Sequence, residues 1–196
     1  MVSISKTNQK MGGIPSISFP PVTTCANCAE CSKKCYAKKM ARFRPSVGRA
    51  WSGNLEEWRT NPDGVRYAIM AAATVSGYFR YFVGGDIPDT AFFEMMIDIA
   101  KAVPRCEFLA FTKKYDIVNN SGRADNLPEN LHVIFSNWGD QIAPNPANLP
   151  TSNVIFKGEE IPNGVKLCGG NCIDCICRGI ACWQLKRGES IYFIEH

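Results

Sequence analysis

Cysteine spacing is the feature that most constrains how this chain folds. Nine of its ten cysteines lie in two short segments, CANCAECSKKC at residues 25–35 and CGGNCIDCICRGIAC at residues 168–182. A disulfide framework spreads its cysteines along a short secreted chain, whereas gaps of two and three residues suit a metal ion or an iron–sulfur cluster. The sequence therefore favours two metal or cluster sites, with disulfides and buried core thiols as the less favoured uses.

The first segment has the ligand spacing of a ferredoxin. Its pattern is Cys25-x2-Cys28-x2-Cys31-x3-Cys35, by which bacterial ferredoxins bind a [4Fe-4S] cluster. A ferredoxin has proline after the fourth cysteine, and this chain has Tyr36. In two-cluster ferredoxins the fourth cysteine ligates the other cluster, so Cys35 need not share a cluster with its neighbours.

The second segment contains a three-cysteine pattern followed by two further thiols. The spacing Cys168-x3-Cys172-x2-Cys175 leaves one iron of a [4Fe-4S] cluster open, unless Cys177 or Cys182 closes it. Paired C-x2-C elements also hold structural zinc, which four thiolates bind tetrahedrally. Iron–sulfur is the favoured interpretation, and zinc is the alternative.

The number of clustered cysteines predicts that one of them is not a ligand. Nine thiols are one more than two four-thiolate sites require, and we expect Cys177 or Cys28 to be the spare. The tenth, Cys106, begins a strand-like segment and is expected to be a small buried hydrophobe.

Positive charge follows the first cysteine segment directly. Residues 33–49 include seven basic side chains and no acidic one, although the whole chain has a net charge of only +4. This patch could stabilise a negatively charged cluster and raise its potential, or it could meet a phosphate-bearing substrate or nucleic acid. A solvated helix surface is the remaining interpretation. The basic residues are Lys33, Lys34, Lys38, Lys39, Arg42, Arg44 and Arg49.

The middle of the chain predicts an α/β fold. Strand-like and helix-like segments alternate, which favours parallel βα units with ligands at the carboxyl ends of the strands. Four such strands are too few for a closed eight-stranded barrel, so we expect a partial open (β/α) barrel with the cysteine-rich loops at its rim. The predicted strands are 78–83, 106–112, 131–137 and 153–158, and the predicted helices include 65–76, 90–103 and 115–120.

We expect a single domain over residues 1–196. Residues 25–49 would hold the first cysteine cluster and a basic helix, 77–160 the βα units, and 168–196 the second cysteine cluster and a terminal strand. Residues 1–24 look irregular. Asn54 is expected to cap a helix that ends at residue 60, and 62–64 to form a turn.

Targeting signals are missing from the sequence pattern. No segment approaches 18 uninterrupted apolar residues, and the first residues lack the apolar stretch of a signal peptide. We therefore expect a cytoplasmic protein with no membrane partner, where reduced thiols make disulfides the less favoured use of cysteine.

Few other residues suggest a reactive site. Of the two histidines, His132 is expected to be structural, and His196 could reach the clusters as a ligand or proton donor. Lys113 and Lys114 follow a predicted strand, and Asp140 follows another, so these side chains are candidates for lining a pocket. The sequence contains no P-loop and no dinucleotide-binding fingerprint.

Several motifs resemble a known family. TTCANCAECSKKCYA, a strand ending in GGD, a later FTKK, an LPEN turn and a cysteine-rich tail resemble the bacteriophage-borne gene product 88 family of cysteine-rich proteins. The resemblance covers most of the chain and implies a phage or mobile-element protein acting in the cytoplasm of a bacterial host. It implies little about activity.

A wider resemblance is to radical S-adenosylmethionine enzymes. The segment YFVGGDIPD is similar to the glycine-rich segment that ends the second strand of that superfamily and receives the amino group of the cofactor. By this resemblance Gly84, Gly85 and Asp86 would contact the cofactor. The superfamily carries its C-x3-C-x2-C pattern after the first strand, whereas here that pattern lies near the C-terminus.

These observations lead to three functional expectations. The first is an iron–sulfur protein, with two [4Fe-4S] clusters, that acts in electron transfer or in redox or sulfur chemistry at an exposed cluster, with a redox partner or a small-molecule substrate. The second is a radical S-adenosylmethionine enzyme. The third is a structural-zinc protein whose basic patch at 33–49 binds nucleic acid.

Overall fold

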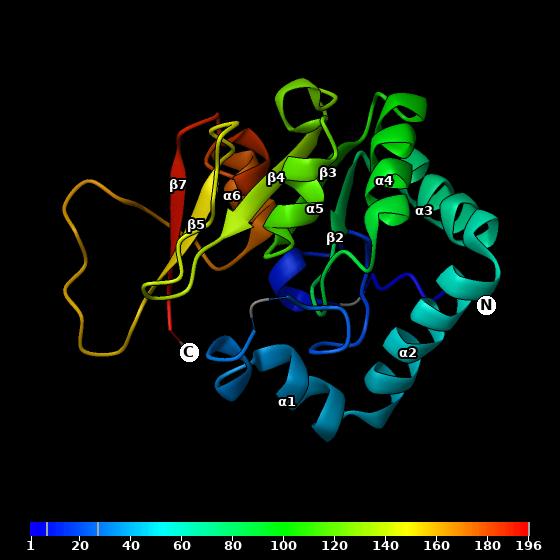
Figure 1. Ribbon diagram of the computed structural model, residues 1–196, viewed down its shortest axis with the longest axis horizontal. Helices are drawn as coiled ribbons and strands as arrows, with labels where there is room; N and C mark the ends of the chain where they lie inside the picture. The colour runs from blue at the N-terminus through cyan, green and yellow to red at the C-terminus, as the bar shows by residue number, and fades with distance from the viewer. Residues whose placement is uncertain (7, 27, 196) are drawn as a thin grey trace.

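A computed structural model describes residues 1–6, 8–26 and 28–195 of the chain (Figure 1). Within these ranges the chain forms six α-helices and seven β-strands. The helices are α1 (Tyr36–Phe43), α2 (Pro45–Thr60), α3 (Pro62–Ser76), α4 (Thr90–Ala102), α5 (Tyr115–Asn120) and α6 (Cys172–Cys177). The strands are β1 (Ser16–Ile17), β2 (Tyr78–Tyr81), β3 (Glu107–Thr112), β4 (Leu131–Ser136), β5 (Thr151–Ile155), β6 (Lys166–Leu167) and β7 (Ser190–Ile194).

The seven strands form one parallel sheet in the order β1-β2-β3-β4-β5-β7-β6. The predicted α/β class is confirmed. In the described ranges β1 and β6 are the sheet edges and do not pair with each other, so the structure shows an open parallel sheet and a barrel is not confirmed. Because the strands are parallel, the carboxyl ends of β2, β3 and β4 meet at one edge, where parallel sheets bind ligands.

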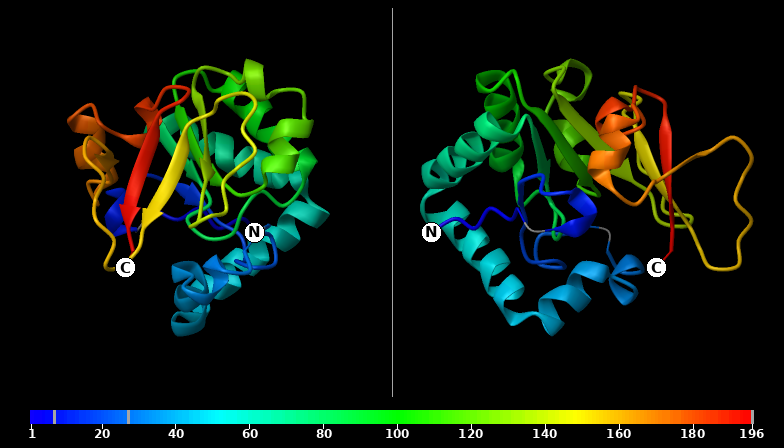
Figure 2. Two further views of the ribbon diagram at one scale, coloured as in Figure 1. Left: turned by 60° about the vertical axis from the view of Figure 1, so that its left-hand side comes forward. Right: turned by 180° about the vertical axis from the view of Figure 1, so that it is seen from behind.

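The two faces of the sheet are covered differently (Figure 2). Alternate residues of a strand point to opposite faces. Phe108 and Ala110 of β3 therefore join the large core beneath α2, α3, α4 and α5, whereas Leu109 joins a smaller cluster with Trp183 and Ile191. The smaller cluster also contacts cysteines of the second segment. One face is thus a helix-covered core, and the other carries the C-terminal cysteines.

Two local predictions are wrong. Asn54 lies inside α2 and is buried, where its amide nitrogen donates to the carbonyl oxygens of Ser3 and Ser18 at 3.0 and 3.1 Å. A polar side chain that can cap a helix can equally satisfy distant backbone groups. The predicted turn at 62–64 is the first turn of α3, capped by Asn61, whose side-chain oxygen accepts from Gly64 N at 3.0 Å.

Some strand boundaries also differ from the prediction. The segment predicted to be irregular contains β1, whose Ser16 pairs with Arg80. The strand predicted at 153–158 is β5, which begins at Thr151 and ends at Ile155. Strands of two residues, β1 and β6, are too short to show a period in the sequence. The described helices include none with the length and hydropathy needed to cross a bilayer.

Candidate functional site

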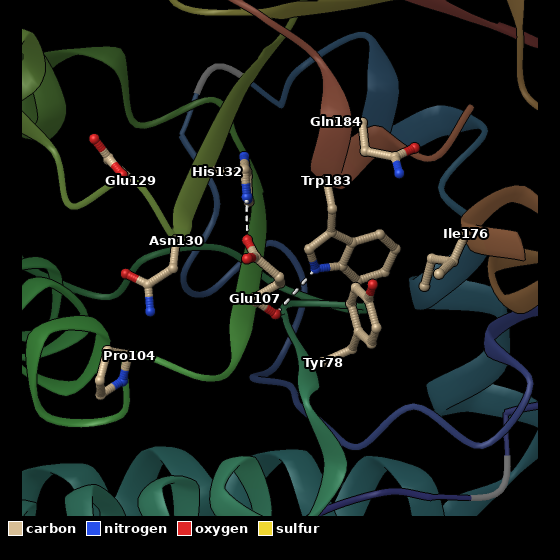
Figure 3. A pocket seen from close by; sticks show the side chains of 9 residues that line it. All are labelled: Tyr78, Pro104, Glu107, Glu129, Asn130, His132, Ile176, Trp183 and Gln184. Carbon is tan, nitrogen blue, oxygen red and sulfur yellow. Dashed lines mark hydrogen bonds and ion pairs between the residues drawn. The ribbon is translucent and has the colours of Figure 1, made fainter. Parts of the chain in front are cut away.

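Two cavities open at opposite ends of the central strands. The first, of about 540 Å³, lies at their amino ends and has no cysteine in its lining. Its wall includes Glu107, whose carboxylate lies 2.7 Å from His132 Nε2, and Trp183, whose indole N–H donates to the Glu107 carbonyl at 3.1 Å (Figure 3). His132 thus pairs with a carboxylate in the cavity wall, and its structural role stays a prediction. His196 lies outside the described residues.

The second cavity, of about 600 Å³, lies at the carboxyl ends of the strands. We call it the cysteine cavity because Cys25, Cys31 and Cys35 line it. Its walls also contain aromatic side chains and the loop that follows β2, and the start of α1 lies at its border. The aromatic and aliphatic lining can exclude water from a group bound there.

The four cysteines of the first segment form the N-terminal cysteine group, which consists of Cys25, Cys28, Cys31 and Cys35. The pKa of Cys25 is raised to about 12, chiefly by burial; a backbone hydrogen bond from Val22 opposes the rise, and the neighbouring charges of Asp86, Cys28 and Cys35 add to it. Burial also raises the pKa of Cys31, while the nearby Lys113 lowers it. Reactive redox cysteines have lowered pKa values, so Cys25 and Cys31 lack the electrostatic environment of a redox-reactive thiol.

Asp86 connects the carboxyl end of β2 to that of β3 in the wall of the cysteine cavity. One carboxylate oxygen accepts a hydrogen bond from Thr112 Oγ1 at 2.6 Å and the other accepts from Lys113 N at 2.8 Å. Its own backbone N–H donates to Thr24 Oγ1 at 3.0 Å. Burial raises the pKa of Asp86 to about 6, and the bond from Thr112 opposes that rise. The side chain thereby holds the floor of the cavity in place.

The glycines before Asp86 are required by close packing. A Cβ atom on Gly84 would lie 2.6 Å from the ring of Trp51, and one on Gly85 would lie 2.5 Å from the carbonyl oxygen of Phe19. Gly85 also has a φ of +76°, which a glycine adopts without strain. Gly84, Gly85 and Asp86 thus lie together in the cavity wall and have structural partners there. Their contact with a cofactor stays a prediction.

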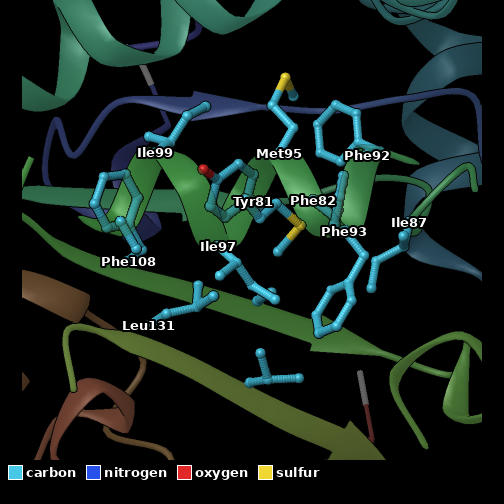
Figure 4. Packing of buried hydrophobic residues seen from close by; sticks show 14 of the residues in the cluster. Tyr81, Phe82, Ile87, Phe92, Phe93, Met95, Ile97, Ile99, Phe108 and Leu131 are labelled. Carbon is cyan, nitrogen blue, oxygen red and sulfur yellow. The ribbon is translucent and has the colours of Figure 1, made fainter. Parts of the chain in front are cut away.

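The loop between β2 and Gly84 contains a strained aromatic residue. Phe82 has a φ of +58°, a conformation that costs a non-glycine residue on the order of 1–3 kcal/mol. Its ring is 5.7 Å from that of Phe92 in the helix-covered core (Figure 4). Such strain persists where surrounding packing imposes it and is concentrated at ligand sites.

Lys113 and Ser136 also line the cysteine cavity. Lys113 Nζ donates to the carbonyl oxygen of Ser136 at 2.7 Å, and the Tyr115 hydroxyl donates to the same oxygen. Burial lowers the pKa of Lys113, whereas the neighbouring Cys31 and Asp86 raise it. The prediction that Lys113 lines a pocket is confirmed. Lys114 and Asp140 are not among the residues that line either cavity.

The second cysteine segment lies between β6 and β7. Four of its thiols contact the smaller hydrophobic cluster, and we call these Cys168, Cys172, Cys175 and Cys182 the C-terminal cysteine group. Burial raises the pKa of Cys172, and it raises that of Cys182 to about 12. Cys177 is exposed and is not among the thiols that contact the cluster, so of the two candidate spares the geometry favours Cys177.

The turn before this group passes close to a sulfur atom. A Cβ atom on Gly169 would lie 2.8 Å from Cys175 Sγ, so a side chain there would displace the thiol. Gly12 has a similar role on the other side of α6, because a Cβ atom there would lie 2.4 Å from Ile173. Close backbone approach of this kind is what a chain wrapping a cluster needs.

Both cysteine groups contain four thiols, but the thiols are not arranged around a common point as the ligands of a bound cluster would be. All ten cysteines are free thiols, and Cys106 is buried as expected. In residues 1–6, 8–26 and 28–195 no three His, Cys, Asp or Glu side chains already stand in a metal-binding arrangement. The thiols of each group are close enough for their charges to interact.

Comparison with known protein families assigns the chain to one of them. A family model described as Gene product 88 matches residues 3–179. The chain belongs to the gene product 88 family. This is a phage-type family, and the resemblance drawn from the cysteine motif and the GGD, FTKK and LPEN segments is confirmed. The chain matches no curated protein and no solved structure.

Sequence reasoning missed one residue between the two cysteine groups. Arg80 lines the cysteine cavity, and its charge also lowers the pKa values of Cys172 and Cys182. The available signal was a charged residue in the middle of the aromatic strand YFRYF, where alternation places it on the face opposite Phe79 and Tyr81.

Proposed function

We propose that this protein binds two iron–sulfur clusters, one on each cysteine group, and acts in electron transfer or in redox or sulfur chemistry at the cysteine cavity. The observation that carries the proposal is the separation of eight thiols into two groups of four at one sheet, with the ninth clustered thiol, Cys177, exposed outside both. Four thiolates are what a [4Fe-4S] cluster requires.

The two sites would have different access to solvent and to other molecules. The N-terminal cysteine group borders an open cavity of about 600 Å³, where a small substrate or a redox partner could reach a cluster edge. The C-terminal cysteine group packs against Leu109, Trp183 and other apolar side chains. We therefore assign any substrate chemistry to the N-terminal site and electron storage or relay to the C-terminal site.

The grouping of Cys182 bears on the radical-enzyme alternative. Reductive cleavage of S-adenosylmethionine needs an iron that no cysteine occupies. Cys182 lies with Cys168, Cys172 and Cys175, and a fourth thiolate would close the C-terminal cluster. The arrangement favours electron transfer over radical chemistry at that site.

The deciding experiment is a measurement of iron, acid-labile sulfide and zinc per chain on protein purified without oxygen. About eight irons with matching sulfide are expected for two [4Fe-4S] clusters. About two zinc ions with no sulfide would instead indicate two structural sites of four thiolates each. Electron paramagnetic resonance with and without S-adenosylmethionine then tests the radical-enzyme alternative, which requires the cofactor to perturb the cluster signal.

A second candidate function is nucleic-acid binding along α1. Its exposed surface combines the basic Lys38, Lys39 and Arg42 with two exposed aromatic residues, Tyr36 at 58% and Phe43 at 75% exposure. Cations that track a phosphate backbone beside aromatic rings that stack on bases are the usual elements of single-strand binding. Of the basic residues before this helix, Lys33 and Lys34 are paired with Glu30 and Glu195 at 2.8 and 2.6 Å. The test is binding of single-stranded oligonucleotides at several salt concentrations.

A further inference from the structure

Arg80 is a cation on the sheet face that carries the C-terminal cysteine group. In β2, Phe79 and Tyr81 point into the helix-covered core, so the alternation of the strand directs Arg80 to the other face. Its guanidinium carbon lies 4.8 Å from the ring centroid of Phe111, and a stacked ring restricts where the guanidinium can move. Arg80 is therefore a half-buried cation that lies over an aromatic ring at the edge of the cysteine cavity.

This cation lacks a carboxylate partner. Across the described ranges no acidic side chain lies within 4.0 Å of Arg80, and its Nε atom is buried without a hydrogen-bond acceptor. Arg80 as a whole is half-buried, and a buried N–H without an acceptor costs free energy that a hydrogen bond to a bound group would recover. The fold therefore leaves room at Arg80 for an anion that the chain's own acidic residues do not supply.

Arg80 is connected to the C-terminal cysteine group through Phe111. The ring on which its guanidinium lies packs against the same hydrophobic cluster as Cys168, Cys172, Cys175 and Cys182. Arg80 also lines the cysteine cavity, which Cys25, Cys31 and Cys35 share. Arg80 is thus close to both cysteine groups: it lines the cavity of the N-terminal group, and it contacts the C-terminal side through Phe111.

We propose that Arg80 is the counter-ion of an anionic iron–sulfur cluster on the C-terminal cysteine group and raises the reduction potential of that cluster. The inference rests on the proposed function. Reduction adds one electron to a cluster that is already negative, and a nearby positive charge stabilises the reduced form more than the oxidised form. Hydrogen bonds to cluster sulfurs act in the same direction, and the unpartnered Nε–H is available to donate one.

The test compares three variants of the full chain, purified without oxygen. Arg80→Gln removes the charge, Arg80→Lys keeps it, and Arg66→Gln is the matched control. Arg66 lies on the outer surface of α3, where it pairs with Asp98 at 3.3 Å, and it should not affect either cluster. Iron and acid-labile sulfide are measured first, and the proteins are then titrated with dithionite against redox mediators while electron paramagnetic resonance follows each cluster.

For Arg80→Gln we expect one of the two cluster couples to become harder to reduce, with an equilibrium constant about tenfold lower, which is about 59 mV for a one-electron couple. Arg80→Lys should shift less, and Arg66→Gln should not shift. Loss of one cluster's iron in Arg80→Gln but not in Arg80→Lys would also support the counter-ion role.

Three results would overturn the proposal. These are unchanged potentials in Arg80→Gln, equal shifts of both couples, or loss of iron from both Arg80 variants, which would give Arg80 a structural role. Each of them leaves two clusters on the wild-type chain and hence the proposed function intact. A wild-type chain without iron and sulfide removes the proposed function itself, together with this inference.

Discussion

The carboxylate of Asp86 accepts a hydrogen bond from the hydroxyl of Thr112 at 2.6 Å, and this contact joins the end of β2 to the end of β3. Burial raises the pKa of Asp86 to about 6 from an ordinary 3.8. Between these pH values the folded protein binds the Asp86 proton more tightly than the unfolded chain does. This contribution to stability is therefore present at low pH and is lost as the pH rises from about 3 to about 7, by about 3 kcal/mol in all at 1.36 kcal/mol per pKa unit.

Asp86→Asn should remove that dependence, because asparagine does not titrate. We expect the free energy of unfolding of the wild type, relative to that of the variant, to fall by about 2 kcal/mol between pH 4 and pH 7. Urea unfolding of both proteins at pH 4, 5, 6 and 7 measures this difference, in which effects of acid on the cysteine groups cancel. Stability curves that run parallel across this range would contradict the assignment.

Gly85→Ala should destabilise the protein more than Gly122→Ala. Both glycines have positive φ, +76° and +67°, but only at Gly85 would the new Cβ meet other atoms, the nearest being Phe19 O at 2.5 Å. Gly122 has open space around it, so its substitution should cost only the backbone strain of about 1–2 kcal/mol. At Gly85 we expect about 1–3 kcal/mol more from overpacking. Thermal unfolding of the two variants makes the comparison, and equal losses would contradict the tight packing.

Cys175→Ser and Cys177→Ser should separate a ligand from a spare thiol. Cys175 lies in the C-terminal cysteine group beside Gly169, whereas Cys177 is exposed. On the proposed function, Cys175→Ser loses about half of the iron and sulfide per chain, because one of two clusters is lost. Cys177→Ser keeps the wild-type content. Iron loss in Cys177→Ser with retention in Cys175→Ser would reverse the assignment.

A matching comparison applies to the N-terminal cysteine group. Cys31→Ala removes a thiol that lines the cysteine cavity and should lower the iron content by about half. Cys106→Ala removes a buried thiol from the helix-covered core and should keep the iron while losing some stability. Iron and sulfide analysis distinguishes them, and an unchanged content in Cys31→Ala would remove this group from the ligands.

The basic surface of α1 can be tested by charge reversal. Replacing Lys38, Lys39 and Arg42 with Glu should weaken binding of a single-stranded oligonucleotide and reduce the slope of log K against log salt by about 0.7 for each lost phosphate contact. The control reverses Lys101 and Arg105, which are exposed at the end of α4 and just after it. Equal binding by the two variants would show that α1 is a solvated surface.

The α/β class and most of the central elements could be predicted because their signals are local. Asp89 caps α4 by accepting from Phe92 N at 2.9 Å, as its position before an apolar helix predicts. Spacing shows the two cysteine-rich segments, but only the folded chain separates Cys182, which packs on the smaller cluster, from the exposed Cys177. By contrast, the cap predicted at Asn54 is wrong. An asparagine amide suits a helix cap equally well in the sequence, and its true partners, Ser3 and Ser18, come close only in the folded chain.

The cysteine cavity could be predicted only in part. Lys113 was expected there because it follows a strand, and the cysteines because of their spacing. Arg80 and the aromatic residues of the cavity wall are not predictable in this way. They lie on strands that are distant in sequence and become neighbours only in the folded sheet. Phe111 and Phe193, whose ring centroids are 5.7 Å apart, are separated by more than eighty positions along the chain.

Because β7 is the last strand of the chain and lies between β5 and β6, the sheet around the two cysteine groups is completed at different times during translation. The N-terminal cysteine group leaves the ribosome before any of the central strands, whereas the C-terminal group precedes β7, which pairs with both of its neighbours. Domains are made from the N-terminus at about 5–20 residues per second. The first four thiols are therefore made several seconds before the strands that line their cavity, whereas β7 follows the second four almost at once.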